Sequence, residues 1–169
     1  EVFRVQSVPG VDWAVPFGLQ NAPALSSSGE SSVVQLIGVD EASLVGMPYD
    51  AILKGDVRDL NMPDAVIANK SRLERLLGEN PGVGQSIEVN DRTARIVGIA
   101  NTALSFTPYP TMYTTYEKLK TFSPGRNRYL TFVLVQPKPG VDEQALVQRI
   151  QAQTGLRAVR MWDLVWENM

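Results

Sequence analysis

The clearest pattern of hydrophobic and polar positions lies between residues 83 and 100. Two short apolar runs, residues 83–89 and 94–100, flank the polar corner Asn90-Asp91-Arg92. Asn and Asp tolerate the left-handed backbone that a tight hairpin turn requires, and apolar runs around such a pair are typical of a β-hairpin. The pattern therefore predicts two antiparallel strands joined by a turn at residues 90–92.

Other short apolar runs, bounded by turn residues, predict further β-strands. Pro23 and the Ser-Ser-Ser-Gly sequence at residues 26–29 predict a loop between the first two of them. The run at residues 129–136 alternates only weakly, which is typical of a well-buried strand. The strands predicted in this way cover residues 11–19, 33–39, 65–68, 111–115, 129–136 and 156–161.

Apolar residues at helical spacing predict helices at residues 2–8, 69–77 and 141–153, and residues 116–122 are expected to form a helical turn. In the helix at residues 141–153, Leu146, Val147 and Ile150 form an apolar stripe. Asp142 and Glu143 lie near its N-terminal end, where the helix dipole favours negative charge. This segment therefore has both the periodicity and the charge placement of an amphipathic helix.

The two middle helices are predicted from their ends and faces. Asn69 is placed to cap the first, its leucines fall on one face, and Gly78 is a plausible C-terminal cap. The second is expected to carry Lys118 and Lys120 outward to solvent.

Turn-rich segments divide these elements into two lobes. Residues 1–45 and 126–169, the two ends of the chain, are expected to form one α/β lobe of βαβ-like units. Residues 46–125 are expected to form an inserted, β-rich lobe with one helix. The predicted fold class is therefore α+β with two lobes.

Composition narrows the possible functions. The 169 residues are 44% hydrophobic, include no His and no Cys, and have a net charge of −2. The chain is long enough to bury a core. It lacks the commonest general base and the thiolate metal ligand. It has no excess positive charge to bind nucleic acid. Its apolar runs are far shorter than the roughly 20 residues of a membrane span.

Two groups of residues invite a chemical interpretation that we do not favour. Gly78, Gly82 and Gly84 suggest a phosphate-binding loop, but no Lys-Ser or Lys-Thr pair follows at the required spacing. Carboxylates cluster in three pairs, for which we expect capping or solvated roles. The pairs are Asp40 with Glu41, Asp56 with Asp59, and Asp142 with Glu143. The sequence therefore predicts no catalytic residue, no cofactor and no metal site.

Aromatic residues suggest two contact regions. Phe106, Tyr109, Met112 and Tyr113 concentrate interface-prone side chains around two prolines, and they form either a partner or substrate contact surface or the core of the inserted lobe. Trp162 and Trp166 lie one helical turn apart and form either a membrane-interface anchor or ordinary core.

Several short motifs, taken in order, resemble the extracytoplasmic core domain of MacB-type, FtsX-like ABC transporter permeases. Each motif is common on its own, and their order and spacing along nearly the whole chain support the resemblance. They are Val8-Pro9-Gly10-Val11, Ile37-Gly38-Val39-Asp40, Val83-Gly84-Gln85-Ser86-Ile87, Ile96-Val97-Gly98-Ile99 and Lys138-Pro139-Gly140-Val141-Asp142.

The resemblance implies a periplasmic, non-catalytic domain between two membrane helices, which relays an ATP-driven conformational change to a substrate or partner. It implies a cytoplasmic ABC ATPase and a second permease copy as partners, and a periplasmic adaptor protein or lipoprotein as further candidates. The absence of an initiator Met agrees with a fragment of such a permease. The residues expected to be membrane-proximal are Val2, Phe3, Trp162 and Trp166.

Two other hypotheses stay open at this point. A free-standing extracytoplasmic binding protein for a peptide or lipid requires a concave apolar pocket, with Phe106, Tyr109 and Met112 as candidate lining. A carboxylate-dependent hydrolase requires two acidic groups that face one cleft.

Overall fold

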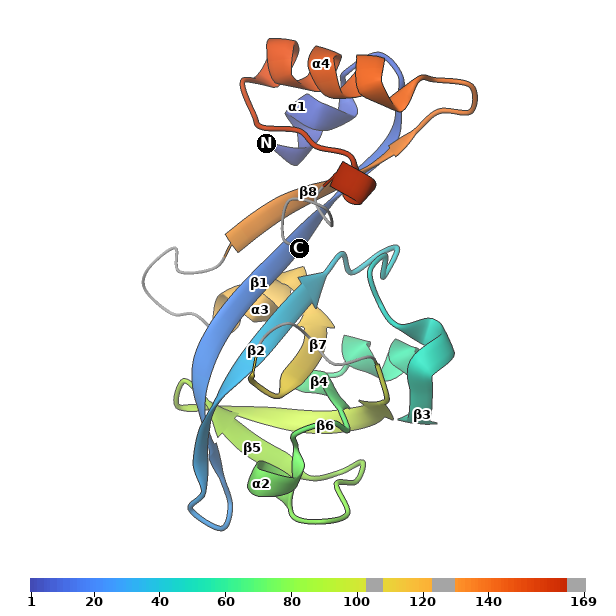
Figure 1. The fold of residues 1–169 in the computed structure, drawn as a ribbon. Helices are drawn as coiled ribbons and strands as arrows, with labels where there is room; N and C mark the ends of the chain where they lie inside the picture. The colour runs from blue at the N-terminus through green and yellow to red at the C-terminus, as the bar shows by residue number, and fades with distance from the viewer. Residues whose placement is uncertain (103–107, 123–129, 164–169) are drawn as a thin grey trace. The chain divides into compact units, whose positions relative to one another are not determined.

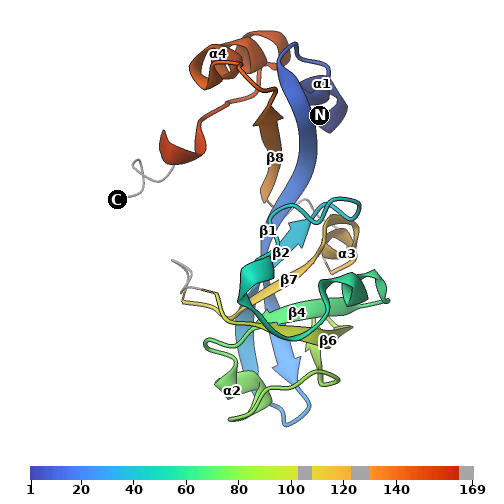
Figure 2. The same ribbon diagram turned by 90° about the vertical axis from the view of Figure 1, so that its right-hand side faces the viewer.

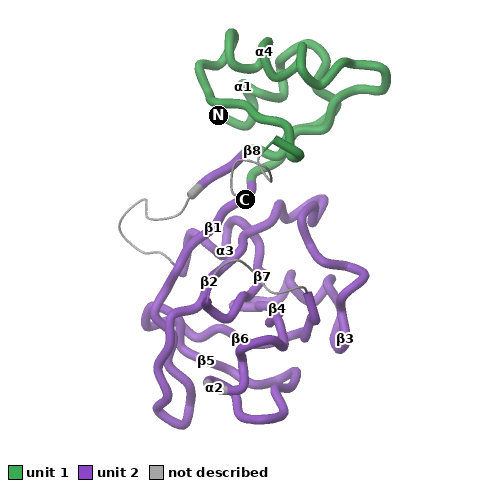
Figure 3. The backbone as a smooth tube through the Cα atoms, viewed as in Figure 1, with its two compact units in different colours: residues 1–16, 133–169 green, residues 17–132 purple. Residues whose placement is uncertain are grey.

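The structure, a computed structural model, describes residues 1–102, 108–122 and 130–163. The chain divides into two compact units, coloured separately in Figure 3. Glu1–Pro16 and Val133–Met169 form what we call the end unit, and Phe17–Phe132 form the barrel unit. Helices and strands are mixed throughout, which confirms the predicted α+β class.

Six strands of the barrel unit pair in a closed circuit (Figure 1). The circuit runs β1–β2–β7–β4–β6–β5 and returns to β1, with β2–β7 and β4–β6 parallel and the other pairs antiparallel. In such a circuit every strand has a neighbouring strand on both sides. The strands are β1 (Val11–Ser26), β2 (Ser31–Val39), β4 (Ala65–Asn69), β5 (Ser86–Val89), β6 (Arg92–Ala100) and β7 (Thr111–Thr115).

One hydrophobic cluster receives side chains from all six strands of the circuit, so it fills the inside of the barrel. Alternate residues of each strand point into it, as the two-residue period of a strand requires. Helices α2 (Glu74–Leu77) and α3 (Tyr116–Thr121) lie at this cluster, with Leu76 and Leu119 among the residues that contribute to it.

A second cluster covers the outer face of β2, β7, β4 and β6. It is formed by the alternate residues of those strands together with the segment that follows β2. That segment contains η1 (Tyr49–Ala51), β3 (Ile52–Gly55) and η2 (Val57–Asn61), and β3 pairs with β6. Because β4 is covered on both faces, all five of its residues are buried.

Helix α3 packs closely on two glycines that face each other across the β1–β2 pair. Gly18 and Gly38 are register partners. A Cβ atom at Gly38 would lie 2.9 Å from the Leu119 side chain and 3.1 Å from the Tyr116 Cα. The absence of a side chain at these positions therefore allows the helix to approach the strands.

The predicted hairpin at residues 83–100 is confirmed. β5 and β6 are antiparallel, with Val89 opposite Arg92. The turn residues Asn90 and Asp91 have φ angles of 49° and 61°, the left-handed conformation that the Asn-Asp pair predicted. The strands predicted at residues 65–68 and 111–115 also form, as β4 and β7.

Two predictions about the middle helices are wrong. Asn69 remains in β4, its side chain donates to Thr102 Oγ1, and α2 is only Glu74–Leu77. Lys118 does not point to solvent: it is half-buried and its Nζ donates to the Leu60 carbonyl oxygen. In both cases a tertiary contact replaces the local arrangement that the sequence predicts.

The end unit places helices α1 (Val2–Gln6) and α4 (Glu143–Thr154) beside each other (Figure 1 and Figure 2). Its strands are the first part of β1 and the second part of β8 (Leu130–Pro137), which are neighbours in the sheet. A third hydrophobic cluster, containing Val5, Leu146 and Ile150, lies between the helices and these strands.

The strand predicted at residues 156–161 does not form. Residues 155–160 are irregular, and Met161–Asp163 begin a helical turn. Leu156 and Ala158 still pack against the end-unit cluster. The alternate residues of this segment are therefore partly buried, as in a strand, although the segment pairs with no strand among the described residues.

The two compact units differ in extent from the predicted lobes, residues 1–45 with 126–169 and residues 46–125. In the structure, residues 17–45 belong with the middle of the chain. The physical reason is strand pairing, because β2 pairs with β7 over Gln35–Thr111 to Val39–Thr115, and β1 pairs with both β2 and β5.

Candidate interaction surfaces

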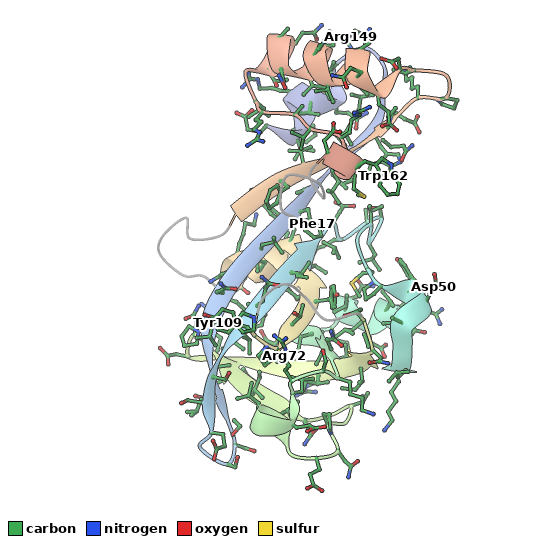
Figure 4. The ribbon with its side chains drawn as sticks, in the orientation of Figure 1. Phe17, Asp50, Arg72, Tyr109, Arg149 and Trp162 are labelled. Carbon is green, nitrogen blue, oxygen red and sulfur yellow. The ribbon has the colours of Figure 1, made fainter. Side chains whose placement is uncertain are left out.

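The aromatic group predicted around residues 106–113 divides between core and surface. Met112 is fully buried inside the barrel, and Tyr113 is buried in the outer cluster. Tyr109, labelled in Figure 4, is half-buried, and Phe106 lies outside the described residues. β7 lies between β2 and β4, and both of its faces are covered. Met112 and Tyr113 are therefore core residues, which is the second of the two alternatives that the sequence left open.

The most exposed large apolar side chains among the described residues belong to the end unit, near its first and last described residues. Phe3 is 89% exposed, whereas Val2 is half-buried and packs on the end-unit cluster. Met161 and Trp162 are each 74% exposed, and Figure 4 labels Trp162 on the short helical turn after α4. Trp166 lies outside the described residues. Sequence reasoning missed Met161, although it directly precedes the tryptophan.

Hydrogen bonds hold the two chain ends together within the end unit. Arg4 Nη2 donates to the Thr154 carbonyl oxygen at 2.9 Å, which joins α1 to the last residue of α4. Arg149 Nη1 donates to the Pro9 carbonyl oxygen. Gln6 Oε1 accepts from the Ala14 N–H at 2.7 Å, which joins α1 to β1. Helix α1 and the residues that follow it are therefore joined to α4 by hydrogen bonds within one unit.

Three of the paired carboxylates have local structural roles. Asp142 Oδ2 accepts from the Ala145 N–H at 2.7 Å and caps α4, and Asp40 Oδ2 accepts from the Ser43 N–H at 2.9 Å. Asp56 accepts from the Arg58 guanidinium and from the Arg58 backbone N–H, and these hydrogen bonds lower the pKa of Asp56 from 3.8 to about 2. Among the described residues, no three acidic, His or Cys side chains gather as a metal site.

The glycines that suggested a phosphate loop use their N–H groups internally. Gly78 donates to the Glu74 carbonyl, Gly84 to the Ile96 carbonyl, and Gly82 to Gln85 Oε1 at 2.6 Å. An anion at this loop would have to replace hydrogen bonds that are already made. These glycines therefore serve turns and caps.

A shallow depression lies beside that loop in the barrel unit. Its lining mixes leucines with serines and has no charged side chain, and Gln85 there is already bonded to Gly82 and to the Leu77 carbonyl. The lining residues are Ser27, Ser28, Leu76, Leu77, Gly78, Gln85 and Ser86. Its lining therefore combines apolar side chains with uncharged polar groups.

Lys118 and Glu41 connect α3 to the outer covering segment. Glu41 Oε1 accepts from the Thr115 hydroxyl at 2.9 Å, and Thr115 is the residue that caps α3. Burial lowers the pKa of Lys118, while the nearby charges of Glu41 and Asp64 act in the opposite direction. These contacts link α3 to the segment that follows β2.

Within residues 1–102, 108–122 and 130–163, none of the helices combines the length and the apolar character that crossing a membrane requires.

Comparison with known proteins identifies the family. The sequence profile of the MacB-like periplasmic core domain matches residues 1–153. No curated protein matches the chain by sequence.

Solved structures share the fold at low sequence identity. The extracellular domain of the noncanonic ABC-type transporter YknZ from Gram-positive bacteria is 19% identical, with a TM-score of 0.67 over 89% of this chain and 78% of that one. The periplasmic region of MacB from Actinobacillus actinomycetemcomitans is 13% identical, with a TM-score of 0.68 over 99% of this chain and 79% of that one. A domain of a putative permease from Porphyromonas gingivalis is 17% identical, with a TM-score of 0.57 over 94% and 70%.

The resemblance drawn from the ordered sequence motifs is therefore confirmed by a match that covers most of the chain. The chain belongs to the MacB-like periplasmic core domain family and is an extracytoplasmic domain of a MacB/FtsX-like ABC transporter permease.

Proposed function

We propose that this domain relays a conformational change, driven by ATP hydrolysis in a separate cytoplasmic ATPase, to a transported substrate or a partner protein. The domain itself performs no catalytic step. The observation that supports this proposal best is the connectivity of the two units. Both chain ends belong to the end unit, and both connections to the barrel unit run inside strands.

Those two strands are suited to transmit a displacement. β1 is one strand of 16 residues from Val11 to Ser26, and β8 is its neighbour in the sheet. An extended strand is already near its maximum length of about 3.3 Å per residue, so it has little slack. A movement of the chain ends is therefore passed on, whereas a flexible linker would absorb it.

The barrel unit is suited to move as one body. Its strand circuit is closed, and the cluster inside it includes fully buried side chains such as Leu36, Ile96 and Phe122. Packed cores deform little, so hinge and shear motions usually move such units intact.

A relay also needs a ligand or partner that binds one conformational state better than the other. We infer that a second permease copy is one partner, and that an adaptor protein or lipoprotein is another. Tyr109 is the described residue that we assign to partner contact. Val2, Phe3 and Trp162 are assigned to the membrane-proximal part of the end unit.

The test is a distance measurement in the assembled permease. Ser27→Cys places a single thiol on the exposed β1–β2 turn of a chain that has no cysteine of its own, once any cysteines elsewhere in the permease are removed. A spin label there reports the distance between the two copies. We expect different distance distributions in the nucleotide-free and ATP-trapped states, and identical distributions would contradict the relay.

A matched pair of insertions sharpens the test. Gly-Gly-Ser inserted after Pro16, where β1 passes between the units, should abolish the nucleotide-dependent change while ATP hydrolysis continues. The same insertion after Pro139, in the turn between β8 and α4, should leave the change intact. Equal effects of both insertions would show that the strands do not transmit the movement.

A further inference from the structure

In the end unit, the outer edge of β8 lacks a partner strand among the described residues. β8 ends the strand order, and β1 is its neighbour on one side. Residues 130–136, Leu-Thr-Phe-Val-Leu-Val-Gln, contain no charged side chain, and the proline comes only at residue 137. Exposed edges in natural proteins usually carry charges, prolines or bulges that prevent pairing. The β8 edge has the composition of a strand that pairs on both sides.

Residues 156–160 have the side-chain pattern of a missing strand. Leu156 and Ala158 pack against the end-unit cluster, while Arg157 and Val159 are exposed. Val133 and Val135 of β8 pack against the same cluster. The segment and β8 therefore present alternate residues to one shared core, which is what two neighbouring strands of one sheet do.

The connection between them is that of a parallel pair. The chain leaves β8 at Pro137, passes through α4 on the end-unit cluster, and turns at Gly155, which has a φ of 72°. Parallel neighbours need a crossover of a dozen or more residues, usually an α-helix. Residues 138–155 provide such a crossover.

Hydrogen bonds flank the segment on both sides, and those at its start join it to α1. At its start, Thr154 Oγ1 accepts from the Leu156 N–H at 3.2 Å, and the Thr154 carbonyl accepts from Arg4. At its end, Arg160 makes two hydrogen bonds of 2.8 Å to the Asp163 carboxylate. The stretch between these hydrogen bonds spans five residues, close to the length of an average strand.

From these observations we propose that residues 156–160 pair with the open edge of β8 as a parallel third strand when the domain is part of the assembled permease. The inference deepens the proposed relay and rests on it, because the third strand would connect the chain after α4 directly to β8. A second copy of the chain at this edge is the competing occupant, and the test separates the two.

The first experiment uses a disulfide in the full permease, with other cysteines removed. Gln136→Cys and Val159→Cys place two thiols on the face away from the core if Leu156 pairs opposite Val133. Neighbouring strands lie about 4.8 Å apart, within disulfide reach, so we expect about tenfold more intramolecular cross-link than in the control pair Gln148→Cys and Val159→Cys. A cross-link between two permease copies would assign the edge to a second copy and overturn the proposal.

Amide hydrogen exchange tests the same pairing without assuming which residues of the two strands lie opposite each other. Pairing should slow the exchange of alternate amides within residues 156–160 by about tenfold relative to an unpaired segment. Slow alternate amides without the cross-link would support pairing in another register. Fast exchange of all of these amides, with no cross-link, would overturn the proposal. Either result is independent of the nucleotide-dependent distance between copies, so a failed third strand and a failed relay are distinguishable.

Discussion

In the barrel unit each strand of the circuit has a neighbour on both sides, whereas in the end unit β8 has a described neighbour on one side only. The barrel encloses a cluster with fully buried residues such as Leu36 and Phe122. The end unit covers a smaller cluster with two helices and leaves Phe3, Met161 and Trp162 exposed. Both units expose some large apolar side chains, but the three most exposed among the described residues all belong to the end unit.

The largest expected change in the free energy of unfolding comes from truncating a side chain inside the barrel. Phe122→Ala removes a fully buried ring and should lower the free energy of unfolding by about 3–5 kcal/mol. Phe3→Ala, at an 89% exposed position of the end unit, should change it by less than about 0.5 kcal/mol. Denaturant unfolding of both variants measures the difference, and similar losses would mean that the exposed end is structural.

A smaller effect is expected where α3 meets the barrel. Gly38→Ala places a Cβ atom against Leu119 and the Tyr116 backbone, so we expect a loss of about 1–3 kcal/mol. The control is Gly82→Ala, where an added Cβ finds only Gln85 Oε1 at 4.0 Å. Thermal unfolding should separate the two variants. Equal stabilities would contradict the close packing of α3 on Gly38.

The end unit should respond to loss of the α4 cap. Asp142→Ala removes the hydrogen bond to the Ala145 N–H and should cost about 1 kcal/mol. Asp142→Asn keeps a capping acceptor and should recover most of that loss. Hydrogen exchange should show faster opening of α4 amides in the alanine variant while barrel amides are unchanged. Faster exchange in both units would mean that the two units unfold together.

The smallest effect concerns pH and the barrel unit. Hydrogen bonds from Arg58 lower the pKa of Asp56 from 3.8 to about 2. A carboxyl with a depressed pKa in the folded state stabilises the fold above its unfolded pKa, and this contribution is lost as the pH falls from about 4 to 2. Asp56→Asn should flatten that part of the stability profile. An unchanged profile between pH 4 and 2 would show that the Asp56–Arg58 pair has no net effect.

Local patterns were sufficient for several elements. The Asn90-Asp91 corner predicted its hairpin because both residues tolerate the positive φ that they adopt. Asp142 and the apolar stripe after it predicted α4, whose cap and buried face depend on residues three or four positions apart. Such contacts are close in sequence, so they can be inferred without knowledge of the rest of the chain.

Predictions that depended on partners far along the chain were less accurate. Met112 and Tyr113 have interface-prone side chains, but β7 lies between two other strands and both residues are buried. Residues 156–161 alternate like a strand, yet pairing requires a neighbouring edge as well as a pattern. The β8 edge that has no partner strand among the described residues, and the exposure of Met161, could not be recognised without the tertiary structure.

The sequence by itself determined the α+β class, the family, the hairpin at residues 90–91 and the absence of the His and Cys side chains used in much enzyme chemistry. Only the tertiary structure decided that β1 closes a circuit with β2 and β5, that residues 17–45 join the middle of the chain, and that β8 has a partner strand on one side only among the described residues. The physical reason is range: turns and caps are satisfied within a few residues, whereas strand pairing and burial depend on segments far apart in the sequence.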